Sequence, residues 1–177
     1  MNITEYTQLK AFARQDGFFL GVLWCLTFAC FVYSIETPEL SLMYLVGIMT
    51  TPLLLYYRLK NYRNVAEGSV SYLRSFAFLL VTTSCASLIL TVGVYAYFRY
   101  LDDGRFMTLM TESLSSPEVR KSFADGGMDL NVLDTQLSAL AQSRPIDMAI
   151  AMLSNTLMGS AFLDAIIALF GRKKTSR

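Results

Sequence analysis

The sequence contains no histidine, and only 16% of its 177 residues are charged, where a soluble domain would be about a quarter charged. The absence of histidine removes the commonest general base and the commonest metal ligand. No Walker loop, glycine-rich dinucleotide turn, serine elbow or Cys/His metal spacing occurs in the chain. These absences exclude the enzyme classes that depend on such motifs, and we expect neither a cofactor nor a metal.

Cysteine and basic patches are also scarce. The three cysteines, Cys25, Cys30 and Cys85, all fall inside apolar runs, which is typical of packing residues and not of disulfides or nucleophiles. The formal net charge is +1, and no basic stripe with interleaved aromatic residues occurs. We therefore expect no nucleic-acid partner.

Long uncharged runs are what the sequence has in abundance. Three uncharged runs of 18 to 23 residues, and a fourth run of 23 residues whose only charged residue is Asp164, are each long enough for a helix that crosses the hydrocarbon core of a bilayer. A cleaved signal peptide is the competing interpretation of the first run, but its apolar core is long for one. We expect a single all-α membrane domain with spans at 17–35, 40–57, 76–98 and 148–170.

Small residues recur every four positions in two of the predicted spans, which places them on one stripe of each helix. Such stripes let neighbouring helices approach closely and hydrogen-bond in lipid. We expect the third-span stripe to be the seam of a helical bundle. The stripes are Gly17, Gly21, Cys25 and Ala29 in the first span, and Thr83, Ser87 and Thr91 in the third.

Two segments outside the spans also have helical patterns. Residues 1–16 carry apolar side chains at helical spacing, which predicts a short amphipathic helix lying at the membrane surface. Residues 99–147 contain eight acidic and five basic residues, a helix-start signal at Ser116-Pro117 and a stop at Gly126-Gly127. This long connection therefore predicts a small helical cap on the bundle.

Positive charge predicts the orientation. The N-terminal segment, the loop after the second span and the C-terminal tail hold ten of the 15 Lys and Arg residues. The positive-inside rule then places both termini in the cytoplasm and the 99–147 loop outside, which is the periplasm in a Gram-negative cell.

Short motifs resemble a family of four-span bacterial inner-membrane proteins that is known only as a domain of unknown function. The resemblance implies the four-span topology and an inner-membrane location, and it brings no catalytic or binding residues with it. The motifs are Tyr57-Arg58, Glu67-Gly68, Ser71-Tyr72, Tyr95-Ala96-Tyr97-Phe98 with Asp102 to Phe106, and Gly171-Arg172-Lys173-Lys174.

Asp164 is the only charged residue inside the fourth predicted span, and it is the main candidate site residue. An ionisable group at this depth suggests a proton relay or ion site, on a polar face formed with Asn155, Thr156 and Ser160. The structural alternative, which we favour, is an ion pair with Arg74 or with Arg58 that holds two spans together.

Two charged clusters have simpler interpretations. Asp102 and Asp103 could bind a divalent cation through oxygen ligands, but Arg99 and Asp103 at four-residue spacing suggest an ordinary surface pair. The basic residues on the cytoplasmic side could attract anionic lipid headgroups, although topology alone requires the same charges. These residues are Arg58, Lys60, Arg63, Arg172, Lys173 and Lys174.

The packing stripes and the shortage of reactive groups favour a non-catalytic accessory or scaffold subunit. Such a subunit would bind lipid, another inner-membrane protein or further copies of itself. The alternative is a small transporter or channel that uses the polar face of the fourth span. A membrane enzyme acting on lipid-linked substrates is a third possibility, but the chain has no recognisable catalytic set.

Overall fold

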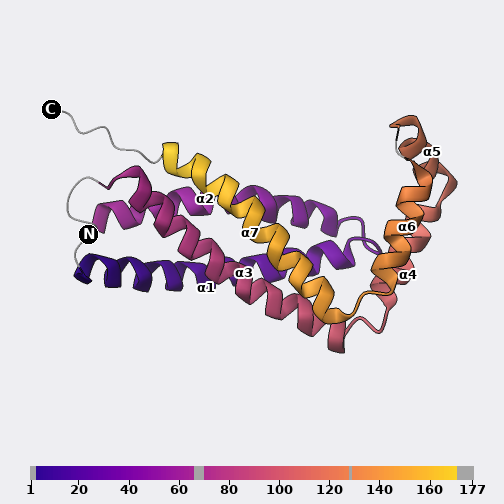
Figure 1. Ribbon diagram of the computed structural model, residues 1–177, viewed down its shortest axis with the longest axis horizontal. Coiled ribbons are helices and arrows are strands. Elements are labelled where there is room, and N and C mark those ends of the chain that lie inside the picture. The colour runs from indigo at the N-terminus through magenta and orange to yellow at the C-terminus, as the bar shows by residue number, and fades with distance from the viewer. Residues whose placement is uncertain (1–2, 66–69, 128, 171–177) are drawn as a thin grey trace.

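The computed structural model describes residues 3–65, 70–127 and 129–170, and within them the chain forms four long and three short helices. All four long helices are long and apolar enough to cross a membrane, so the expected all-α, four-span fold is confirmed. The long helices are α1 (Ile3–Tyr33), α2 (Leu40–Val65), α3 (Tyr72–Tyr100) and α7 (Pro145–Phe170), and the short ones are α4 (Arg105–Ser115), α5 (Pro117–Asp125) and α6 (Leu130–Ala141) (Figure 1).

The start of the chain differs from the sequence prediction. Residues 3–16 are not a separate surface helix, because they form the first turns of α1 and run without a break into the span. Leu9 and Ala13 are buried in the same apolar cluster as Leu55 and Leu59 of α2. Packing against the end of α2 therefore continues α1 beyond its uncharged run.

The helix α3 is the centre of the bundle. It packs along α1 on one side and α7 on the other, whereas α2 packs mainly against α1 (Figure 1). Thr83 and Ser87 are fully buried, and the Ser87 hydroxyl donates to the Thr83 carbonyl at 2.8 Å. Because such a hydroxyl is satisfied by its own helix, it can face a neighbouring helix without a cost in unpaired polar groups. The predicted seam is confirmed.

Glycines of α1 permit the close approach of α1 to α3. A Cβ atom at Gly17 would lie 2.7 Å from the Thr82 carbonyl oxygen, and one at Gly21 would lie 2.8 Å from the Cβ of Ile89. Neither distance is possible between real atoms, so a larger side chain would push the two helices apart. The small-residue stripe of the first span thus faces the seam.

The three short helices form a cap at one end of the bundle, opposite the end where α1 begins and α7 ends (Figure 1). Phe106 of α4 attaches the cap, because its ring lies 6.1 Å from that of Phe31 and 5.6 Å from that of Phe98. Arg105 adds an ion pair with Glu36 at 2.6 Å, which ties α4 to the turn between α1 and α2.

The cap contains an exposed ion pair between two of its helices and two buried leucines. Arg120 of α5 donates two hydrogen bonds of 2.9 Å to the carboxylate of Asp134 on α6. This guanidinium lowers the pKa of Asp134 below its usual value. Leu133 and Leu137 of α6 are buried. The helical cap predicted for residues 99–147 is thus present.

Candidate functional site

Asp164 of α7 is completely buried at the seam with α3. Thr83 of α3 donates its hydroxyl hydrogen to Asp164 Oδ2 at 2.7 Å, while Oδ1 has no hydrogen-bond partner among the described residues. The Thr83 oxygen also lies 3.1 Å from the Leu79 carbonyl and 3.3 Å from the Leu80 carbonyl, so one hydroxyl hydrogen serves three competing acceptors. The carboxyl group is therefore only partly satisfied in a membrane-spanning segment.

The prediction of an ion pair between Asp164 and Arg74 or Arg58 is wrong: among the described residues, neither arginine pairs with Asp164. Arg74 donates from Nε to the Tyr62 hydroxyl at 3.0 Å, and Arg58 forms an ion pair with Asp16 at 3.2 Å. Arg74 lies in the first turn of α3, nine residues before Thr83, which is about 13 Å along the helix. The prediction compares how far Asp164 and Arg74 lie from the ends of their spans, and that comparison does not locate the point at which α7 contacts α3.

The polar residues predicted as one face of the fourth span differ in exposure: Thr156, Ser160 and Asp164 follow one stripe of α7, whereas Asn155 lies about 100° further round the helix. Ser160 is buried beside Asp164, and its hydroxyl donates to the Leu157 carbonyl at 3.2 Å. Thr156 is half-buried and donates to the Met152 carbonyl at 2.7 Å. Asn155 is exposed on the outside of the bundle, and its side chain makes no hydrogen bond within the described residues. Asn155 therefore does not share the buried stripe of Ser160 and Asp164.

An apolar cavity of about 400 Å³ lies between α2 and α7, in the half of the bundle nearer the cap. We call it the groove. Its volume lies within the range of about 300–1,000 Å³ that is typical of ligand pockets. Its walls include Trp24, Phe28 and Phe31 of α1, Ile48 of α2, and Met152 and Thr156 of α7.

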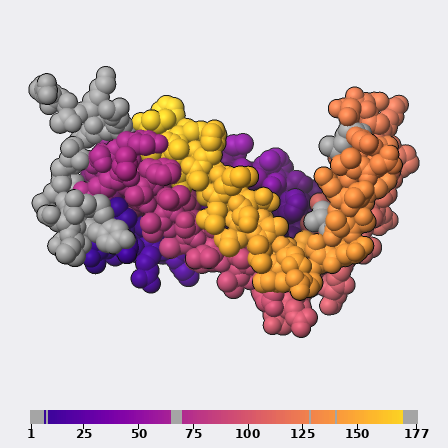
Figure 2. Space-filling view, viewed as in Figure 1, coloured from indigo at the N-terminus to yellow at the C-terminus, as the bar shows by residue number. Residues whose placement is uncertain are grey.

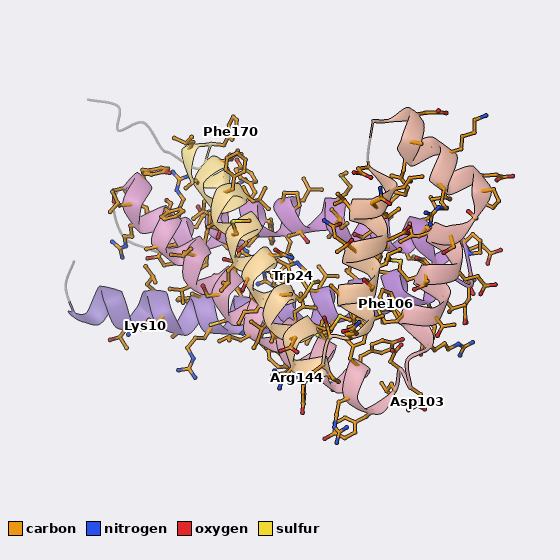
Figure 3. All side chains as sticks on the ribbon, turned by 45° about the vertical axis from the view of Figure 1, so that its right-hand side comes forward. Lys10, Trp24, Asp103, Phe106, Arg144 and Phe170 are labelled. Carbon is orange, nitrogen blue, oxygen red and sulfur yellow. The ribbon has the colours of Figure 1, made fainter. Side chains whose placement is uncertain are left out.

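A second cavity, of about 780 Å³, lies where the cap joins the bundle, and we call it the outer pocket. Asp102 lines it and is 4% exposed. Its Oδ1 accepts hydrogen bonds from the Tyr97 hydroxyl at 2.9 Å and from the Phe106 backbone N–H at 2.8 Å. Within the described residues Oδ2 accepts none. Figure 3 shows Trp24 among the long helices, and Phe106 and Arg144 where the cap meets them.

The expected pair between Arg99 and Asp103 does not form, because α3 ends at Tyr100 and the chain turns. Asp103 is exposed with a positive φ of 43°, whereas the neighbouring Asp102 is buried. No group of three or more Cys, Asp or Glu residues in the described ranges is arranged to hold a metal ion. The two adjacent carboxylates therefore have separate surroundings.

A comparison with known protein families assigns nearly the whole chain to one family. Residues 15–173 match the family described as Protein of unknown function (DUF4199). The chain belongs to this family. No curated protein and no solved structure matches the chain.

Membership of DUF4199 agrees with the resemblance seen in the sequence. The match runs from the middle of α1 to just beyond α7, so all of α2 to α7 lies within the DUF4199 region. Together with the four apolar helices, this identifies a multi-pass integral membrane protein. The family description gives no activity, so function must be inferred from the geometry of this chain.

The basic residues predicted to contact lipid are only partly described. Arg58 is occupied by Asp16 and also lies 5.9 Å from the ring centroid of Phe19. Lys60 is exposed and Arg63 is half-buried, both in the last turns of α2 at the end opposite the cap. Lys60 and Arg63 remain the better candidates for a lipid contact. The tail residues Arg172, Lys173 and Lys174 lie outside the described residues.

Sequence reasoning missed the groove and the outer pocket. Both depend on how far α2 and the cap stand from α7, and no local pattern in the sequence reports that separation. One signal was available in the chain: Trp24 is its only tryptophan and lies in the middle of the first span. Its indole N–H donates to the Thr51 hydroxyl at 3.1 Å, which fixes the ring at the wall of the groove.

Proposed function

We propose that this chain is a non-catalytic accessory or scaffold subunit of a bacterial inner membrane, which binds another protein through the lipid-facing side of α7. The side chain of Asn155 carries the proposal. It lies ten residues into α7, about 15 Å along the helix and therefore close to the middle of the bilayer core. It is exposed there, without a hydrogen bond from the described residues.

An amide exposed to hydrocarbon is costly, because lipid chains offer no hydrogen-bond partner. A second helix can satisfy it, and an amide is self-complementary because it both donates and accepts. Asn155 therefore favours association with a protein over contact with lipid alone.

The surroundings of Asn155 permit such an approach. Ala151 and Gly159 lie one turn before and one turn after it on the same exposed stripe. A Cβ atom at Gly159 would meet no atom within 4 Å, so nothing in this chain explains a glycine there. Small residues on both sides of a polar one are typical of helix–helix interfaces in lipid.

Replacement of Asn155 tests this association. Asn155→Leu should weaken assembly by about 1–2 kcal/mol, or roughly tenfold in Kd. Thr50→Val on α2 is the matched control, because the Thr50 hydroxyl already donates to the Val46 carbonyl at 2.7 Å within its own helix. Fluorescence co-localisation of two differently labelled copies in nanodiscs measures self-association, and copurification in mild detergent captures a different partner. A lone monomer in both assays would overturn the proposal.

The orientation we propose places both termini in the cytoplasm and the cap outside. Arg58, Lys60 and Arg63 all lie at the end of the bundle opposite the cap, which supports this assignment through the positive-inside rule. A cysteine at Gly126 should react with an impermeant maleimide in intact cells. Gly126 suits the test, because it is exposed and its φ of −77° is open to any residue. Reaction only after lysis would reverse the orientation.

Transport is the second candidate, and the unpartnered Oδ1 of Asp164 is the observation that favours it. A buried carboxyl oxygen in a span is a possible cation or proton site. The exposure of Asn155 on the outside of the bundle, away from the buried Ser160 and Asp164, argues against a path lined by all of these polar residues. Ion flux in proteoliposomes that disappears in Asp164→Asn, with unchanged folding, would rank transport above the scaffold role.

A further inference from the structure

The groove and the outer pocket lie end to end. Phe28 lines the groove and Phe98 lines the outer pocket, and their ring centroids are 6.2 Å apart. On α7, Met148 lines the outer pocket and Met152, one helical turn further on, lines the groove. The two cavities therefore lie next to each other along α7, one in the membrane interior and one at the level of the cap, and we call the pair the track.

The track opens to the side of the protein. The helices α2 and α7 make few contacts with each other, and Figure 2 shows the molecule hollowed between α7 and the cap, with α2 visible beyond them. At the depth of the groove the surrounding medium is hydrocarbon. An acyl chain can thus enter between α2 and α7 and lie against the Trp24, Phe28 and Met152 side chains.

The chemistry changes from one end of the track to the other. The groove walls are almost wholly apolar, whereas Asp102, Thr108, Thr111, Glu112 and Ser143 line the outer pocket. None of the described residues that line the outer pocket is basic, and the nearby Arg105 and Arg144 are paired with Glu36 and Asp147. The free Oδ2 of the buried Asp102 is an acceptor without a donor.

We propose that this track binds one lipid whose headgroup carries a primary ammonium, with an acyl chain in the groove and the ammonium donating to Asp102 Oδ2. Apolar walls at membrane depth match the chain, and two carboxylates match the cation. An anionic headgroup would meet Asp102 and Glu112 without a compensating base. This site lies on the cap side of the bundle and does not depend on the association proposed for Asn155.

Because Trp24 is the only tryptophan and lines the groove, its fluorescence reports an occupying chain directly. The protein is reconstituted into phosphatidylcholine vesicles that contain small fractions of lipid brominated in mid-chain. Brominated phosphatidylethanolamine should half-quench Trp24 at an about tenfold lower mole fraction than brominated phosphatidylcholine, because only the primary ammonium donates charge-assisted hydrogen bonds. Brominated phosphatidylglycerol should show no preference over phosphatidylcholine.

Variants assign the headgroup site. Asp102→Asn keeps an oxygen for the Tyr97 hydroxyl and the Phe106 N–H but removes the charge, so the preference for phosphatidylethanolamine should disappear. Asp103→Asn is the matched control: it removes the same charge at the adjacent position, where the side chain is exposed, and Asn tolerates its positive φ. The preference should be unchanged in this control.

A second pair of variants tests the groove without altering the α3–α4 turn. Ile48→Phe should fill the groove and reduce the phosphatidylethanolamine preference, whereas Ile150→Phe on the lipid-facing side of α7 should leave it intact. Equal quenching of the native protein by all three lipids would overturn the proposal. A preference that survives Asp102→Asn would overturn the headgroup assignment. If Asp102→Asn fails to fold, a preference that survives both Glu112→Gln and Ile48→Phe would overturn it instead.

Discussion

The spans α2 and α3 differ in which side chains they bury and which they turn toward lipid. The helix α3 has the higher mean hydropathy, 2.1 against 1.5, and 44% of its most apolar window is buried inside the protein against 17% for α2. Yet hydropathy does not explain which helix is central, because lipid is as apolar as a protein core. The buried side of α3 is rich in Ser and Thr, whereas Leu42, Met43 and Leu53 of α2 face outward. The small and hydroxylated side chains of α3, which allow close contact between helices, therefore explain why α3 and not α2 lies at the centre of the bundle.

The largest effect should come from enlarging a glycine at the α3 seam. Gly17→Ala would place a methyl group 2.7 Å from the Thr82 backbone oxygen, which cannot move aside, and should cost about 1–3 kcal/mol. Gly47→Ala on α2 meets side-chain atoms of Thr27 and not backbone, and it would displace the Thr27 hydroxyl from the Leu23 carbonyl; alanine also favours the helix by about 1 kcal/mol, so the net cost should be smaller. Unfolding in mixed detergent–SDS micelles compares the two, and equal costs would contradict the difference between the seams.

The next effect concerns Asp164, at the contact between α7 and α3. Thr83→Val removes the hydroxyl that donates to Asp164 Oδ2 and should destabilise the protein by about 1–2 kcal/mol. Adding Asp164→Leu should recover part of this loss, because the double variant no longer leaves a carboxyl group without a donor. The same unfolding titration measures the cycle. Additive losses would mean that Thr83 and Asp164 are not energetically coupled.

The seam was predictable from the sequence, but the contacts across it were not. A four-residue repeat such as Gly17 and Gly21 shows which stripe of a helix is small, and that property is local. The partner of Asp164 depends on where α7 crosses α3, which tertiary packing decides, so the sequence predicts Arg74 where the structure has Thr83. The groove beside Trp24 depends on the separation of α2 and α7 and has no local signature at all.

A smaller effect is expected at Gly159, on the outward side of α7. Gly159→Ala meets no atom of this chain, so the isolated subunit should gain up to about 1 kcal/mol from helix propensity. The methyl group would nevertheless stand at the face proposed for association and should weaken assembly. Unfolding titration and nanodisc co-localisation should therefore change in opposite directions. Loss of stability in the monomer would show that this face is covered within the subunit itself.

The smallest effect should occur at Leu53 of α2, which is 70% exposed. In a soluble protein an exposed leucine leaves water only when a partner covers it, but here the side chain faces lipid in both the folded and the unfolded membrane-inserted states. Its transfer free energy cancels, so Leu53→Ala should change the free energy of unfolding by less than about 0.5 kcal/mol. Unfolding titration in monodisperse micelles provides the measurement. A cost well above this would mean that a protein surface, and not lipid, covers α2, and the contrast between α2 and α3 would then be one between two kinds of protein interface.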